Sequence, residues 1–146
     1  MFCIGHQVGI GASAEIVYRA LTVDSELSKW WTTDTLGAGE VGSIIKFRFN
    51  GHGPDMKIIR LISNKLVEWE CVGGGPDIWI GTLVSFQLIE KEKQILVNFK
   101  HSNWQDQSDF MNHCSMKWAV FLLSLKDLIE KGVGSPFPDD ISINHS

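Results

Sequence analysis

One histidine lies where a side chain could carry chemistry inside an apolar interior. His101 follows Ile95, Val97 and Phe99 at two-residue spacing, so it shares the apolar side of a strand with them. In such a setting an imidazole can hydrogen-bond to a ligand or act as a general acid or base. It can equally be a structural residue that satisfies a backbone group or the start of the following helix. The sequence favours the structural interpretation and leaves the other two open.

Motifs for the common kinds of catalysis and cofactor binding are missing from the sequence. Residues 37–42 read GAGEVG, but a strand follows them where a dinucleotide site needs a helix. There is no GxSxG segment to hold a nucleophilic serine. Cys3, Cys71 and Cys114 are far apart, and no CxxC or HxxxH spacing indicates a disulfide framework or a zinc site. We therefore expect no cofactor and no metal, and binding in preference to catalysis.

The composition limits the class of protein. The chain has 146 residues, the size of one domain, and 44% of them are hydrophobic. Its 13 Lys and Arg against 17 Asp and Glu give a formal net charge of -4, which argues against a nucleic-acid partner. The longest apolar run, at 118–123, is far shorter than the roughly 20 residues of a membrane span. The first residues lack the basic start of a signal peptide, so we expect a cytoplasmic protein.

The elements that must position these side chains follow from hydrophobic periodicity. Alternating apolar residues predict antiparallel strands at 2–10, 43–50, 56–63, 66–72, 78–90 and 94–101. Ser13 is a suitable N-cap for a short helix over 14–21. Asp24 or Ser25 can cap a second short helix, which ends near Trp31. The predicted sheet therefore has about six strands, with two short helices after the first.

A long helix is predicted near the end of the chain, from about 106 to 131. Phe110, Cys114, Trp118 and Phe121 recur at three- and four-residue spacing and form an apolar stripe. The one surface that can bury this stripe is the concave face of a curved sheet, which gives an α+β fold. We expect one domain over 1–133 and a tail over 134–146. The sequence leaves open whether the tail is loose or covers the mouth of a cavity.

Several stretches, in this order and spacing, resemble the START-like helix-grip (SRPBCC) superfamily. The stretches are ASAEIVYRALT…LSKWW, GEVGSIIKFRF, NKLVEWE, IGTLVSFQLIE, ILVNFKHSNW and CSMKWAVFLLSLKDLIEKG-x-G-x-P. Within the superfamily the chain is most similar to the group related to the C-terminal domain of the activator of the Hsp90 ATPase. The resemblance covers roughly 4–138. It implies a curved sheet gripping the long helix, and a family that includes carriers of apolar molecules, polyketide cyclases and co-chaperone domains.

The resemblance also implies a cavity between sheet and helix. We expect this cavity to hold a small hydrophobic ligand, with these residues in contact with it: Trp31, Trp69, Val84, Phe86, Phe99, His101, Cys114 and Trp118. One alternative is a co-chaperone-like interaction module, with an exposed apolar patch at Trp30, Trp31 and 73–79. The other is a cyclase-like or hydrolytic enzyme in which His101 is the acid or base. The sequence leaves open whether the protein is a monomer or a homodimer.

Overall fold

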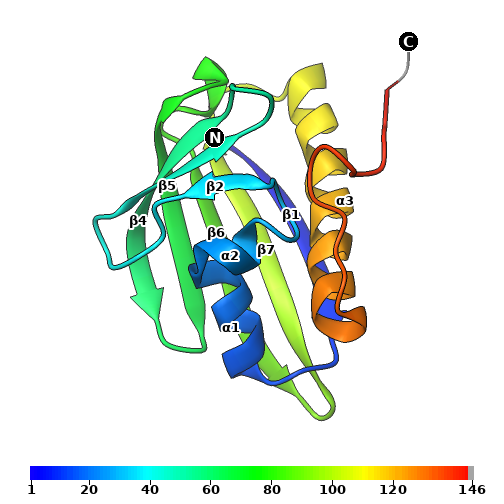
Figure 1. Cartoon of the computed structure of the whole chain (residues 1–146). Helices are drawn as coiled ribbons and strands as arrows, with labels where there is room; N and C mark the ends of the chain where they lie inside the picture. Colours follow the sequence, from blue (N-terminus) through cyan, green and yellow to red (C-terminus); the bar gives the residue numbers. More distant parts are fainter. Residues whose placement is uncertain (145–146) are drawn as a thin grey trace.

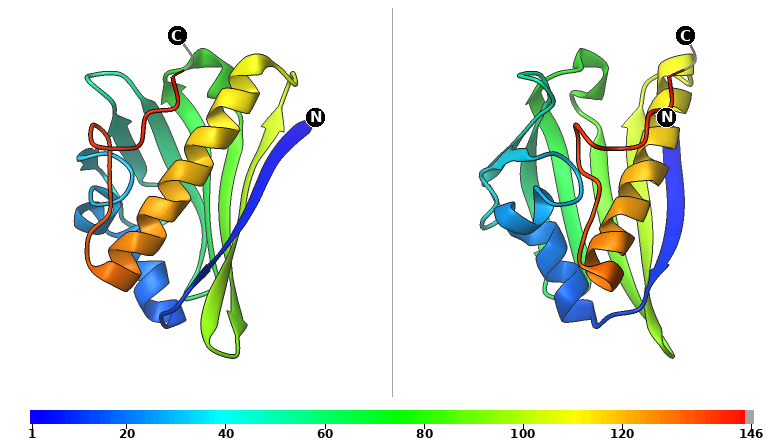
Figure 2. Two further views of the ribbon diagram at one scale, coloured as in Figure 1. Left: turned by 90° about the vertical axis from the view of Figure 1, so that its right-hand side faces the viewer. Right: turned by 45° about the vertical axis from the view of Figure 1, so that its right-hand side comes forward.

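The computed structural model describes residues 1–144. In this part of the chain, seven antiparallel strands form one curved sheet, and the long helix α3 lies across its concave face (Figures 1 and 2). The strand order is β1-β7-β6-β5-β4-β3-β2, so the first strand pairs with the last. The α+β fold, with two short helices after the first strand, is confirmed.

The strands agree with the predicted ranges, apart from the edge strand β2 and the start of β6. They are β1 (Phe2–Ile10), β2 (Asp34–Leu36), β3 (Ile44–Arg48), β4 (Pro54–Ile62), β5 (Leu66–Gly74), β6 (Leu83–Lys91) and β7 (Gln94–Trp104). β2 was not predicted, because three residues carry too little alternation to be recognised. β6 begins later than expected, since Asp77–Trp79 form the 3-10 helix η1 and Gly81 turns the chain at a φ of +90°.

Local capping fixes the ends of the helices. In α1 (Ala14–Thr22) the predicted cap is confirmed, because the Ser13 hydroxyl accepts from the backbone N–H of Ile16. α2 (Asp24–Leu27) is shorter than predicted, and turns continue from it to Trp31. α3 (Asp109–Lys131) begins after the expected 106, because the Ser108 hydroxyl accepts from the backbone N–H of Met111. None of the helices among residues 1–144 is long and apolar enough to cross a membrane.

The space between α3 and the middle of the sheet is filled by aromatic side chains. The rings of Phe99 on β7 and Trp118 on α3 lie with their centroids 4.6 Å apart, which closes the gap between the two layers. Phe86 lies 5.2 Å from Phe99 and 5.2 Å from Trp69, so the contact continues from strand to strand. Because these side chains are fully buried, this part of the helix grip is a packed core.

The segment after α3 turns back and runs beside the helix (Figure 2). The backbone N–H of Phe137 donates to the carbonyl oxygen of Trp31 at 2.7 Å, and the Ser135 N–H donates to the Ser124 hydroxyl at 2.7 Å. Gly134 lies so close to its neighbours that a Cβ there would come within 2.4 Å of the Lys29 carbonyl oxygen. The first residues of the tail, 134–137, are therefore packed against the domain.

Candidate functional site

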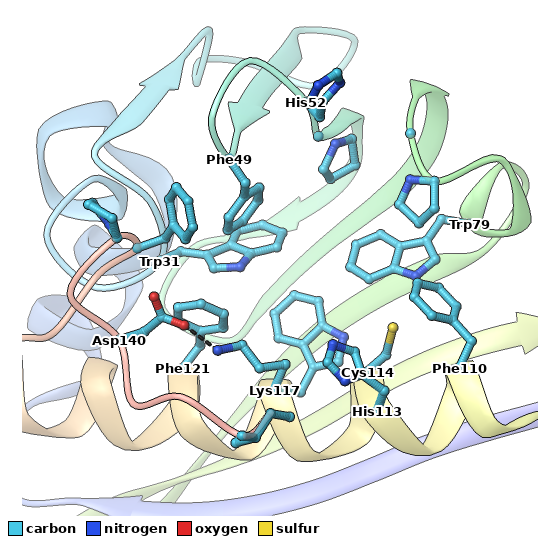
Figure 3. A pocket seen from close by; sticks show the side chains of 18 of the residues that line it. Trp31, Phe49, His52, Trp79, Phe110, His113, Cys114, Lys117, Phe121 and Asp140 are labelled. Carbon is cyan, nitrogen blue, oxygen red and sulfur yellow. Dashed lines mark hydrogen bonds and ion pairs between the residues drawn. The ribbon is translucent and has the colours of Figure 1, made fainter. Parts of the chain in front are cut away.

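A cavity of about 760 Å³ opens at one end of the grip, above the aromatic core. Its walls come from the N-terminal half of α3, the β3–β4 and β5–β6 connections, and the tail (Figure 3). Seven large aromatic side chains line it: Trp31, Phe49, Trp79, Phe110, Trp118, Phe121 and Phe137. The lining is therefore largely apolar, as in sites that take small organic molecules.

Trp31 is held at the centre of the wall by contacts on several sides. Its ring lies 4.8 Å from that of Trp118 on α3 and 4.2 Å from that of Phe47 on β3. Its carbonyl oxygen accepts the backbone N–H of Phe137, so the tail is fixed to the same residue. The turn after α2, the sheet, α3 and the tail thus meet at Trp31.

The β3–β4 hairpin forms one rim of the cavity, and Arg48 determines its shape. The Arg48 guanidinium donates to the carboxylate of Asp55 at 2.7 Å and to the Gly53 carbonyl oxygen at 3.1 Å. Gly53 is required, because a Cβ there would lie 2.0 Å from the carbonyl oxygen of Phe47. These contacts position Phe49 and His52 at the cavity.

His101 lies beneath the cavity in a chain of buried hydrogen bonds. The indole N–H of Trp118 donates to its Nδ1 at 3.0 Å. Because Nδ1 accepts, the neutral ring carries its proton on Nε2 and donates to the Thr82 hydroxyl at 2.8 Å. That hydroxyl donates in turn to the carbonyl oxygen of Trp79 at 2.6 Å. Both ring nitrogens of His101 are therefore occupied by protein groups.

The burial of His101 keeps the ring neutral. Desolvation lowers the pKa of this imidazole from 6.5 to about 3. His101 is fully buried and does not line the cavity. The geometry fits the structural interpretation, in which His101 positions the wall residues Trp118 and Trp79.

The eight residues expected to contact a ligand fall into two groups. Trp31, Cys114 and Trp118 line the cavity. The other five lie in the packed core beneath it: Trp69, Val84, Phe86, Phe99 and His101. Alternation along a strand identifies the inward side, but it does not show how far each inward side chain lies from an opening. Contact with a ligand stays a prediction for all eight.

Sequence reasoning missed the polar part of the wall. Lys117 on α3 and Asp140 on the tail form an ion pair, and the Lys117 ammonium also donates to the Ile141 carbonyl oxygen at 3.3 Å. The same ammonium lies 5.1 Å from the centroid of the Phe121 ring. The spacing of His113, Lys117 and Phe121 was a usable signal, because residues four apart share a helix face. The tail carried no comparable pattern.

The chemical groups of the wall favour binding. Burial raises the pKa of the Cys114 thiol to about 11, so the sulfur is a neutral thiol near pH 7. Among residues 1–144 no cluster of three or more His, Cys, Asp or Glu side chains is placed to hold a metal ion. The site can thus bury apolar surface, offer one cation at Lys117 and present the carboxylate of Asp140.

Comparisons with known proteins place the chain in a family. The sequence model described as Activator of Hsp90 ATPase homolog 1-like protein matches residues 11–130. The solution structure of the Aha1 dimer from Colwellia psychrerythraea is 58% identical, with a TM-score of 0.86 over 92% of this chain and 100% of that one. No match to a curated protein was found.

More distant structures share the fold. SSP2350 from Staphylococcus saprophyticus is 19% identical, with a TM-score of 0.76 over 91% of this chain and 95% of that one. CalU16 from Micromonospora echinospora is 18% identical, with a TM-score of 0.70 over 88% of this chain and 74% of that one. The chain belongs to the Activator of Hsp90 ATPase homolog 1-like family, within the START-like helix-grip superfamily.

Proposed function

We propose that this protein binds a small apolar molecule in the cavity above the aromatic core. The observation that carries the proposal is the contrast between the buried aromatic core, which fills the space between α3 and the sheet, and the open cavity beside it. The side chains around Phe99 are buried against one another, whereas seven large aromatic side chains border about 760 Å³ of open space. Apolar surface in contact with water is unfavourable, and a bound molecule of that size range would remove it from water.

A neutral fluorescent probe tests this proposal. N-phenyl-1-naphthylamine should bind at one site per chain, with enhanced emission and quenching of tryptophan fluorescence. His113→Trp places bulk at an exposed wall position, and Met116→Trp places the same bulk at an exposed position of α3 outside the wall. His113→Trp should weaken binding by about fivefold or more, roughly 1 kcal/mol, and Met116→Trp should leave it unchanged. A wild-type protein that does not bind the probe would contradict the proposal.

A second candidate function is interaction with an Hsp90-type chaperone. The family match and the 58% identity to a protein described as Aha1 support it. The expected exposed patch at Trp30 and Trp31 is wrong, because both side chains are buried against the core. The exposed apolar side chains beside the 73–79 segment are Ile80, at 50% exposure, and Val72, at 39%. The test measures the ATPase rate of a purified bacterial Hsp90 alone, with this protein, and with its Ile80→Asp variant.

We further propose that the chain forms a homodimer. The support is its 58% identity to the protein whose solution structure is described as a dimer. Light scattering coupled to size-exclusion chromatography measures the mass directly. A mass near twice that of one chain, 16.4 kDa, at micromolar concentration is the expected result, and a mass of one chain at the highest soluble concentration would contradict it.

A further inference from the structure

The cavity contains a built-in ion pair between the tail and α3. Lys117 is the only Lys or Arg among the wall residues that the structure describes. Its partner Asp140 belongs to the tail, and 8% of that side chain is exposed. Figure 3 shows the Asp140 carboxylate meeting the Lys117 ammonium beside the Phe121 ring. The Asp140 carboxylate of the protein itself is therefore already paired with the Lys117 ammonium in an otherwise apolar cavity.

The two partners are anchored very differently. Lys117 lies in the middle of α3, a helix of 23 residues. Asp140 belongs to the end of the described tail, at 140–144, which forms no helix or strand. In the described part of the chain, every hydrogen bond that joins 140–144 to residues 1–134 is made by Lys117, to Asp140 and to Ile141. If the pair opens, the cation stays at the cavity and the carboxylate moves out to water.

From this geometry we propose that the cavity takes an amphipathic monoanion, whose acidic group replaces Asp140 on Lys117. The proposal rests on ligand binding in this cavity, and it adds the class of ligand and the role of the tail. The ligand has an aromatic or other apolar body and one carboxylate or sulfonate. The tail acts as an internal competitor that occupies Lys117 while the cavity is empty.

Lys117 lowers the electrostatic cost of admitting an anionic ligand into an apolar cavity. A charge enters an apolar site at low cost only when an opposite charge is there to meet it, and Lys117 provides one. Exchange of one carboxylate for another keeps the ammonium paired, and the displaced Asp140 regains its hydration. The Lys117 ammonium also lies over the Phe121 ring, so an aromatic body that follows the acidic group into the cavity meets the aromatic wall.

Two probes that differ in one group isolate the charge. N-phenyl-1-naphthylamine is neutral, and 1-anilinonaphthalene-8-sulfonate has the same ring system with one sulfonate. The key variant is Asp140→Asn, which removes the competitor. Asp139→Asn is the matched control, because it makes the same change of net charge at an exposed neighbouring residue. Lys117→Met removes the cation and keeps much of the apolar stem.

A tethered carboxylate competes at high effective concentration, so its removal should have a clear effect. Asp140→Asn should bind the sulfonate probe about tenfold tighter and the neutral probe within about twofold of wild type, a difference of roughly 1.4 kcal/mol. Asp139→Asn should change neither affinity. Lys117→Met should weaken binding of the sulfonate probe and abolish the gain from Asp140→Asn in the double variant, as a direct coupling requires.

The outcomes separate this inference from the function on which it rests. Equal effects of Asp140→Asn and Asp139→Asn on the sulfonate probe would overturn the inference, and so would a gain that persists in the Lys117→Met background. In both cases binding of the neutral probe would leave the proposed function standing. If the wild type and Asp140→Asn proteins bind neither probe, the proposed function itself fails and the inference fails with it.

Discussion

The indole N–H of Trp118 donates to Nδ1 of His101 at 3.0 Å, which joins α3 to β7 directly beneath the cavity. A wall residue is thereby fixed by a hydrogen bond within the packed core. Because the indole N–H is the one polar group of the Trp118 side chain, this bond helps to orient its ring. The hydroxyl of Thr82 fixes the other side of the imidazole at 2.8 Å and extends the connection to Trp79. The shape of the cavity therefore depends on polar groups that do not line it.

The buried His101 makes the stability of the protein dependent on pH. Burial lowers the pKa of its imidazole from 6.5 to about 3. Between these values the unfolded chain binds a proton that the folded chain does not, so stability decreases as the pH falls. The loss attributable to His101 should approach about 1.4 kcal/mol per pH unit in this window. Urea unfolding at pH 4, 5, 6 and 7 measures it, as the difference between wild type and His101→Gln.

The His101→Gln variant serves as the reference, because an amide can accept from Trp118 and donate to Thr82 without titrating. All other ionisable groups are the same in the two proteins, so their contribution cancels in the difference. The unfolding free energies of wild type and His101→Gln should differ most at pH 7 and approach each other as the pH falls to 4. Identical slopes over the whole range would show that His101 does not titrate as its burial requires.

We expect the Thr82 hydroxyl to contribute substantially to the free energy of unfolding, because it accepts a buried hydrogen bond from His101. Thr82→Val keeps the shape of the side chain, but it leaves the His101 Nε2–H buried without an acceptor. The expected loss of unfolding free energy is about 1–3 kcal/mol, measured by urea unfolding at pH 7. Thr82→Ser retains the hydroxyl and should lose less than Thr82→Val. A Thr82→Val protein as stable as wild type would mean that this hydrogen bond contributes nothing.

The sheet and the long helix α3 were predictable from the sequence, because apolar residues recur in both at regular spacing. Ile95, Val97, Phe99 and His101 alternate with more exposed residues, and all four are buried in β7 as their spacing indicates. The Ser13 cap was predictable for a similar reason, since a short polar side chain before an apolar helical pattern has few other roles. Such features depend on residues close in sequence.

The position of the cavity could not be predicted in the same way. Both Phe99 and Trp118 point inward, but their rings contact each other at 4.6 Å and fill the space where a ligand was expected. Whether facing side chains meet or leave a void depends on the distance between two elements far apart in sequence. The tail, which supplies Phe137 and Asp140 to the wall, has no periodic pattern at all. Its role follows only from long-range contacts.

Core and wall residues should respond differently to truncation. Phe86→Leu removes ring contacts with Phe99 and Trp69 in the packed core, so it should lower the unfolding free energy by about 1–3 kcal/mol. It should leave the affinity for N-phenyl-1-naphthylamine within about twofold. Phe49→Leu changes a wall residue and should weaken probe binding at a smaller cost in stability. Urea unfolding and fluorescence titration of the same two variants measure both quantities. Weaker probe binding in Phe86→Leu than in Phe49→Leu would place the ligand within the core.

The three cysteines should react in an order set by burial. Cys3 is exposed, whereas burial raises the pKa of Cys71 and of Cys114 to about 11. Since the thiolate is the reactive form, iodoacetamide at pH 8 should modify Cys3 first and the other two only slowly. Peptide mass spectrometry of timed samples gives the rate at each residue, and a urea-unfolded sample gives the reference.

Cys114 also lines the cavity, so N-phenyl-1-naphthylamine should slow its modification further and leave Cys71 unaffected. Equal protection of both buried cysteines would indicate that the probe stabilises the whole fold and does not cover Cys114.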